Sequence, residues 1–202
     1  MDSLPSRAVV VVVVLLGCAG SAGADAQLSE RVATTVEADY LEPSPGRKVF
    51  PVARSTWYSV INFANDWHAP RMRLIGGKWV QVGIHEGIDI FGEPGTPVHA
   101  VTGGTIERVG WLFYSGWRVG IRADDGRYWF YAHLEDAPGV VEGQRVAAGD
   151  TIGALGNTGY GNRPGHKDEF AAHLHLGIQE PTGEWADPYP LMKDLYAREL
   201  RR

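Results

Sequence analysis

The sequence has a single cysteine, at position 18, so the chain cannot form an internal disulfide. It also has no basic excess, because 24 Asp and Glu outnumber 19 Lys and Arg and give a formal net charge of -5. An acidic balance offers no electrostatic basis for nucleic-acid binding. Beyond residue 70 no stretch shows a sustained helical periodicity. These absences argue against a disulfide-stapled scaffold, a nucleic-acid-binding protein and a mainly helical domain.

The N-terminus resembles an export signal. The apolar run of residues 8–16 is too short to span a bilayer as a mature helix and fits the core of a signal peptide. Gly17 and Cys18 follow it directly, and Leu15-Leu16-Gly17-Cys18 resembles a bacterial lipobox, which predicts lipidation of Cys18. Ordinary cleavage after Ala24 or Ala26 is the alternative, because each residue ends an A-x-A sequence. We therefore expect an exported protein, either a lipoprotein on the periplasmic face of the outer membrane or a soluble periplasmic or secreted one.

Short apolar runs separated by turn residues dominate the rest of the chain. The 26 glycines and 12 prolines favour short strands over long helices. Asp124-Asp125-Gly126 and Pro181-Thr182-Gly183 each predict a hairpin. Strands are expected at residues 98–101, 105–111, 117–123, 127–134, within 140–155, at 173–179 and around Trp185. The predicted fold is mainly β, an antiparallel sandwich or partly open barrel with few short helices.

Two pairs of residues with strand-like spacing predict a metal site. On an extended segment His85 and Asp89 point to the same face, and Gly87 between them leaves room for both side chains. His173 and His175 share one face of a strand in the same way. A catalytic zinc site uses three protein ligands with N, O or S donors and keeps one position for water, so two histidines and one aspartate satisfy its needs.

A fifth candidate, His133, ends the predicted strand 127–134 on the same side as Trp129 and Tyr131. Any one of these histidines alone is more often a structural residue than a ligand, and only the combination indicates a site. The remaining histidines lie in settings typical of packing, rim or loop residues: His68, His99 and His166.

In their order and approximate spacing, these residues resemble the lysostaphin-type (LytM-type) zinc endopeptidases. The matching motifs are Asp66-Trp67 with Pro70-Arg71, His85-Glu86-Gly87-Ile88-Asp89-Ile90, Gly95-Thr96-Pro97-Val98, Tyr131-Ala132-His133-Leu134, residues 149–159, and His173-Leu174-His175. The resemblance implies the duplicated hybrid motif fold of that family and one zinc ion held by His85, Asp89 and His175. It also implies that His133 and His173 are catalytic histidines that do not bind the metal.

The expected division of the chain follows from the resemblance and the N-terminal signal. We expect a signal peptide at 1–18 (alternatively 1–26), a linker at 19–50, a zinc metallopeptidase domain at 51–192 and a C-terminal tail at 193–202.

Two features depart from the family pattern. Ala172 and Leu176 flank the His173–His175 motif where Pro and Phe are usual, and the loop between Gly159 and His173 is longer than usual. Neither removes a ligand, but both make substrate specificity less transferable.

The resemblance implies hydrolysis of peptide bonds in bacterial peptidoglycan, with His173 as the base and His133 stabilising the oxyanion, or with these roles exchanged. Ala19 after the cysteine suits a Gram-negative lipoprotein, and such walls lack Gly bridges. This favours a D,D-endopeptidase acting on D-Ala–diaminopimelate links. The alternatives are a Gly-Gly endopeptidase and a non-catalytic relative that activates an amidase. Such regulators typically lose zinc ligands, whereas His85, Asp89, His133, His173 and His175 are all present here. A lipoyl-type carrier is disfavoured because residues 141–155 contain no lysine. Peptidoglycan peptides are the expected partner, and no oligomer is implied.

Loops at the open end of the sheet should line the substrate groove. The candidate loops are 67–83, 111–116 and 156–172. Arg71 and its neighbour Arg73 could pair with a stem-peptide carboxylate or could be ordinary surface charges. The further groove candidates are Trp111, Tyr114, Asn157 and Tyr160.

Overall fold

The computed structural model describes residues 46–54 and 61–201, which belong to one compact unit covering residues 40–202. The predicted signal peptide, the lipidation site at Cys18 and most of the expected linker lie outside the described residues. Within these residues no helix is long and apolar enough to cross a membrane.

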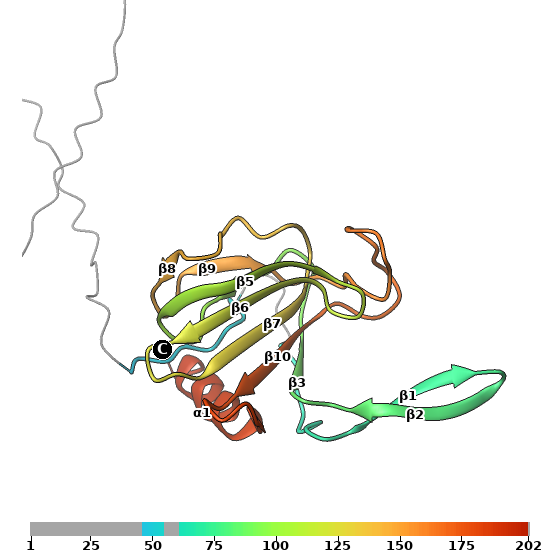
Figure 1. The fold of residues 1–202 in the computed structure, drawn as a ribbon. Coiled ribbons are helices and arrows are strands. Elements are labelled where there is room, and N and C mark those ends of the chain that lie inside the picture. Colours follow the sequence, from blue (N-terminus) through green and yellow to red (C-terminus); the bar gives the residue numbers. More distant parts are fainter. Residues whose placement is uncertain (1–45, 55–60, 202) are drawn as a thin grey trace, which may run out of the picture. The chain divides into compact units, whose positions relative to one another are not determined.

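A seven-stranded antiparallel sheet forms the body of this unit (Figure 1). Its strands are β3 (Ile88–Phe91), β5 (Gly104–Leu112), β6 (Gly116–Ala123), β7 (Tyr128–Leu134), β8 (Arg145–Val146), β10 (His173–Gln179) and β11 (Trp185–Ala186). They follow the order β11-β10-β7-β6-β5-β8, and β3 pairs with the other end of β10. A separate two-stranded sheet joins β4 (Pro97–His99) to β9 (Thr151–Ala154). The expectation of a mainly antiparallel β fold is confirmed.

Alternation along β10 separates the core from the polar face. Leu174 and Leu176 are fully buried and Ile178 is nearly so, as the sequence pattern predicts for one face of a strand. Leu176 lies opposite Tyr131 of β7, which is also fully buried. Burying each such side chain stabilises the fold by roughly 1.5–3 kcal/mol. The core therefore fixes β10 in a register that presents His173 and His175 on the other face.

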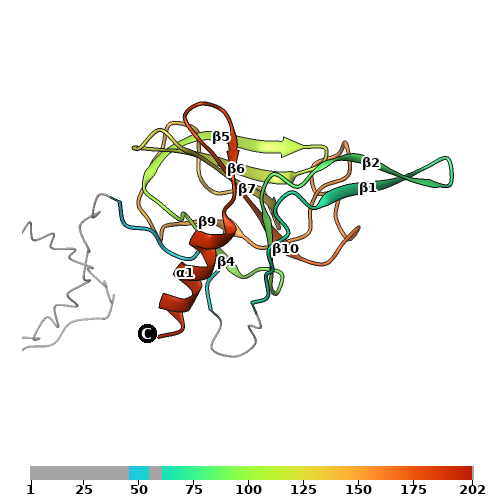
Figure 2. The same ribbon diagram turned by 90° about the horizontal axis from the view of Figure 1, so that it is seen from below.

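The segment expected as the groove loop 67–83 instead contains a hairpin of β1 (Pro70–Ile75) and β2 (Lys78–Ile84). Gly76 and Gly77 form its two-residue turn and both have positive φ, a conformation that glycine adopts without steric cost. This Gly-Gly turn between two apolar runs is a hairpin signal that the sequence contained. In Figures 1 and 2 the hairpin extends away from the large sheet. Its large apolar side chains are exposed at Met72, Leu74, Ile75, Trp79, Val80, Val82 and Ile84.

Both ends of the expected domain differ from the sequence-based boundaries. The amide of Val49 donates to the carbonyl of Val101, and Phe50 is buried, so the packed structure begins before residue 51. At the other end, residues 193–199 continue the helix α1 (Tyr189–Glu199) where a tail was expected. Leu191, Met192, Leu195 and Tyr196 have helical spacing and form an apolar stripe, and Met192 and Leu195 are buried.

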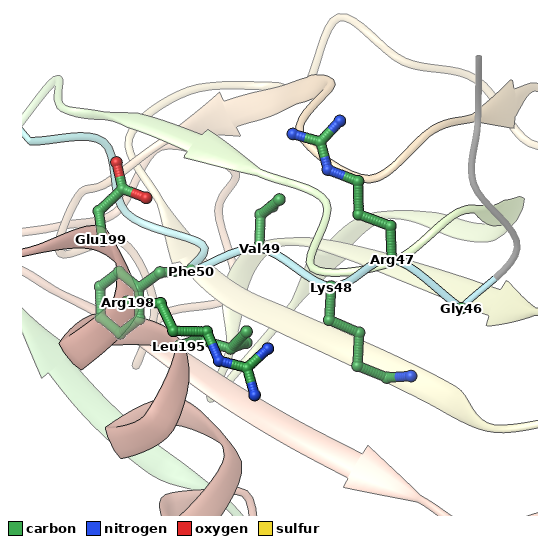
Figure 3. A pocket seen from close by; sticks show the side chains of 8 residues that line it. All are labelled: Gly46, Arg47, Lys48, Val49, Phe50, Leu195, Arg198 and Glu199. Carbon is green, nitrogen blue, oxygen red and sulfur yellow. The ribbon is translucent and has the colours of Figure 1, made fainter. Parts of the chain in front are cut away.

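A cavity of about 260 Å³ lies between residues 46–50 and α1 (Figure 3). The side chains of Arg47 and Lys48 leave the backbone in opposite directions there, so their charges do not converge on one point. None of the predicted site residues lines this cavity.

Candidate metal centre

Three side chains from β3, β10 and the bend before β3 converge at the edge of the large sheet. Asp89 lies directly opposite His175 in the β3–β10 register. His85 Nε2 is 2.9 Å from His175 Nδ1 and 3.1 Å from Asp89 Oδ1, and His175 Nδ1 is 3.0 Å from Asp89 Oδ1. Tetrahedral zinc, with ligand distances of about 2.0–2.1 Å, places its donor atoms roughly 3.3 Å apart. The triangle therefore fits a zinc ion with little adjustment.

A backbone carbonyl near the triangle orients the His85 ring so that its Nε2 atom can bind a metal ion. Its Nδ1 lies 3.0 Å from the carbonyl oxygen of Asp66, which can only accept a hydrogen bond, so Nδ1 carries the proton. The Nε2 lone pair therefore faces Asp89 and His175. Gly87 supplies the space that the sequence suggested, since a Cβ there would lie 2.7 Å from Cε1 of His175.

The charge balance also suits a cation. Burial opposes ionisation of Asp89, but hydrogen bonds with His175 and His85 outweigh it and hold the pKa of this carboxyl far below its usual range. Burial likewise lowers the pKa of His85, yet its contacts with the carboxylates of Asp66 and Asp89 raise it to about 9, so a metal ion that binds Nε2 must displace the proton there. An ionised, buried carboxylate beside two imidazoles is a donor set that a divalent cation can neutralise.

Two further histidines flank the triangle with matching tautomers. Nδ1 of His133 lies 2.7 Å from the carbonyl oxygen of Thr158, and Nδ1 of His173 lies 2.8 Å from that of Ala171. Each Nδ1 is therefore the donor, which leaves Nε2 as the ring nitrogen available to other partners. Their ring centroids are 4.7 Å apart, and Nε2 of His173 lies 3.7 Å from Asp89 Oδ1. Burial lowers the pKa of His133 to about 3, with a smaller contribution from His173, so His133 is neutral at pH 7.

His133 reaches this position by a route that strand alternation does not predict. Strict alternation would place it on the same side as Trp129 and Tyr131, as the sequence-based interpretation assumed, but these two side chains are buried in the core. Its φ of 61° lies in the left-handed region, which is costly for a non-glycine residue. The turned side chain packs against Phe170, at 4.7 Å between ring centroids, on the same face as His173 and His175.

Comparison with known proteins gives the family. The model of peptidase family M23 matches residues 83–188, which contain the three donors and both flanking histidines. The chain belongs to peptidase family M23. Among the described residues, His85, Asp89 and His175 are the group whose donor atoms lie close enough together to hold a metal ion.

Relatives of this M23 chain carry names that refer to different bonds. It is 40% identical over 152 residues to the L-Ala–D-Glu endopeptidase of Bacillus subtilis, covering 73% of this chain and 44% of that protein. It is 38% identical to the glycyl-glycine endopeptidase ALE-1 of Staphylococcus capitis, over 55% of this chain and 30% of that one. It is 36% identical to the peptidoglycan DD-endopeptidase ShyC of Vibrio cholerae, over 55% and 23%. The chain thus spans less than half the length of these relatives.

Solved structures agree on the fold. The crystal structure of a LytM protein from Ruminococcus gnavus superposes with a TM-score of 0.61 at 34% identity, covering 72% of this chain and 59% of that one. The fold expected from the sequence resemblance is therefore confirmed.

The groove candidates of this M23 domain occupy distinct positions. Arg71 Nη2 lies 3.0 Å from Asp89 Oδ2, so this guanidinium already has a partner at the metal centre. Trp111 donates through Nε1 to the carbonyl oxygen of Gly161 and thereby anchors the long loop. Tyr114, Tyr160 and Phe170 form a row of ring contacts that ends at His133: Tyr114–Tyr160, Tyr160–Phe170 and Phe170–His133.

The other histidines lie outside the cluster of the five site residues. His68 stacks on Trp67, His99 lies near Thr151, and His166 pairs with Glu169. Sequence reasoning missed the contributions of Asp66 and Phe170. Asp66 lies in a matched motif but has no metal-ligand spacing of its own, and Phe170 lies in the loop that departs from the family pattern.

Proposed function

We propose that this domain hydrolyses peptide bonds in the peptide part of bacterial peptidoglycan. The observation that carries the proposal is the donor triangle of His85, Asp89 and His175 beside two histidines that each bond a backbone carbonyl through Nδ1. Zinc bound at the triangle would polarise the scissile carbonyl and lower the pKa of water there to about 7.

The two flanking histidines take different roles in this proposal. His173 accepts the proton of the attacking water at Nε2 and passes it to the nitrogen of the leaving amine, because that atom lies 3.7 Å from Asp89 Oδ1 at the triangle. An oxyanion role for His133 would need a proton on Nε2, yet Nδ1 already holds its proton against Thr158 and burial opposes a second one. His133 is therefore better suited to orient the water as an acceptor.

The scissile bond is the finer part of the proposal. The L-Ala–D-Glu bond of the stem peptide is favoured by the 40% identity to the Bacillus subtilis enzyme over 152 residues. The D-Ala–diaminopimelate cross-link expected from the sequence is the second candidate, favoured by the similarity to ShyC. Export, with or without lipidation of Cys18, is also a proposal and would place the enzyme with its substrate.

Digestion of purified sacculi tests both parts. Sacculi with diaminopimelate cross-links and sacculi with Gly bridges are incubated with the zinc-loaded protein and with His133→Ala and His173→Ala variants. Mass spectrometry then identifies the new termini of the released muropeptides. A free D-Glu N-terminus supports the stem-peptide bond, and loss of cross-linked dimers with release of D-Ala carboxyl groups supports the D,D link. Absence of zinc-dependent products from both wall types would refute the proposal.

A further inference from the structure

A cavity of about 560 Å³ opens beside the proposed proton carrier His173. One wall runs from Phe91, at the end of β3, to Pro94, and the other is formed by Asn157 and by residues 170–172 just before β10. The rings of Phe91 and Phe170 lie 5.2 Å and 5.0 Å from the His173 ring. A group held in this cavity would therefore lie next to His173.

The side chains of the cavity wall offer acceptors and aromatic faces but no cation. The carboxylate of Glu93 is exposed and has no ion-pair or hydrogen-bond partner among residues 46–54 and 61–201. Asn157 uses Nδ2 to donate to Asp168 Oδ1 and to the carbonyl oxygen of Phe170. What Asn157 can offer to a ligand is therefore its amide oxygen.

Such a wall suits a primary ammonium group. An ammonium can pair with Glu93, donate to the Asn157 amide oxygen and contact the faces of Phe91 and Phe170. We propose that this cavity binds the free side-chain ammonium of the diamino acid in a stem peptide. The inference rests on the proposed function, and it names the substrate feature that the same site recognises.

The chemistry of the ligand sets a preference between forms of the wall polymer. A cross-link acylates the side-chain amine of the diamino acid, whereas an uncross-linked stem keeps it as an ammonium. The enzyme then acts preferentially on uncross-linked stems, which fits hydrolysis within the stem rather than at the D-Ala–diaminopimelate link.

The test uses two synthetic stem peptides that differ only in acetylation of the diamino acid side chain. Wild-type enzyme should cleave the free-amine peptide with a kcat/KM roughly 5- to 20-fold higher, as expected for an exposed ion pair combined with cation–π contacts. Glu93→Gln should reduce this preference about 2- to 5-fold, because it lowers kcat/KM for the free-amine peptide and leaves kcat/KM for the acetylated peptide unchanged. Glu86→Gln removes an exposed acid that does not line the cavity and should keep the full preference.

Direct binding separates this inference from the proposed function. Zinc-loaded His133→Ala, which binds without rapid turnover, is titrated with both peptides, and the same titration is repeated with Glu93→Gln added. Cleavage of both peptides by the wild type at equal rates overturns the ammonium site and leaves the peptidase proposal standing. If neither peptide is cleaved, the peptidase proposal fails for stem peptides, and tighter binding of the free-amine peptide that depends on Glu93 still supports the site. Equal binding of both peptides refutes it.

Discussion

Replacing Arg71 by alanine should weaken zinc binding. Asp89 directs Oδ1 towards His85 and His175, while its other oxygen, Oδ2, lies 3.0 Å from Arg71 Nη2. The guanidinium therefore fixes the rotation of the carboxylate and leaves Oδ1 as the metal donor. Without Arg71, this buried carboxylate can rotate and loses a charge-assisted hydrogen bond.

The expected magnitude follows from the exposure of the pair. Loss of a residue that orients a metal ligand typically costs 10- to 100-fold in metal affinity. The Arg71 side chain is 41% exposed, so water can replace part of its contact, which favours the lower end of the range. We expect the zinc Kd to rise about 10-fold, equivalent to about 1.4 kcal/mol. Arg71→Lys keeps the charge but not the planar fork and should give an intermediate Kd.

A competitive titration of zinc against a chromogenic chelator measures this effect without reference to activity. Arg73→Ala is the matched control, because Arg73 lies on the same strand and bonds to the Tyr114 hydroxyl at 3.2 Å instead. Its zinc Kd should equal that of the wild type. A zinc Kd within twofold of the wild type in Arg71→Ala would refute the orienting role. A raised KM with unchanged zinc affinity would instead support the sequence-based interpretation that Arg71 contacts a substrate carboxylate.

Local periodicity was sufficient to predict much of the fold and the donor set. The alternating Leu174, Leu176 and Ile178 identified the core face of β10, and the opposite face then had to present His173 and His175. The convergence of Asp89 with His175 depends on the antiparallel pairing of β3 and β10, which are 86 residues apart at this point. Local periodicity does not specify that pairing, so it indicated the candidate donors by their spacing alone, and the family resemblance supplied the choice of His85, Asp89 and His175 as ligands.

The features that the sequence did not indicate arise from long-range contacts. The left-handed backbone of His133 has no local signal such as glycine, because the contact with Phe170 and the hydrogen bond to Thr158 hold it in place. The ion pair of Arg71 with Asp89 links residues 18 positions apart across a hairpin that was expected to be a loop. Nothing in the sequence indicated this contact, so Arg71 was expected at the substrate instead. The helix α1 was missed because an 11-residue amphipathic segment is too short for its periodicity to indicate a helix clearly. Packing of Tyr196 against Phe50 stabilises it in the folded domain.

Three further predictions concern the metal donors, the N-terminus and the space around His175. His175→Ala should abolish stoichiometric binding of one zinc per chain, and full zinc content in this variant would contradict the ligand assignment. His133→Ala and His173→Ala should retain zinc in metal analysis but lose roughly 10²- to 10⁴-fold in kcat. Cys18 should incorporate a fatty-acid analogue in metabolic labelling, and a mature N-terminus at Asp25 or Gln27 would show ordinary signal cleavage instead. Gly87→Ala should raise the zinc Kd although no donor is removed, because the added Cβ would lie 2.6 Å from the carbonyl oxygen of Leu176 and 2.7 Å and 2.8 Å from Cε1 and Nε2 of His175. The carbonyl is fixed in β10 and cannot move aside, so the His175 ring or the bend before β3 must shift, and overpacking of this kind costs about 1–3 kcal/mol. The shift should appear both as a lower melting temperature of the metal-free protein and as weaker zinc binding, with Gly83→Ala, where a Cβ meets nothing within 4 Å, as the matched control. If Gly87→Ala matched Gly83→Ala in both measurements, the close approach of residue 87 to His175 would not constrain the site.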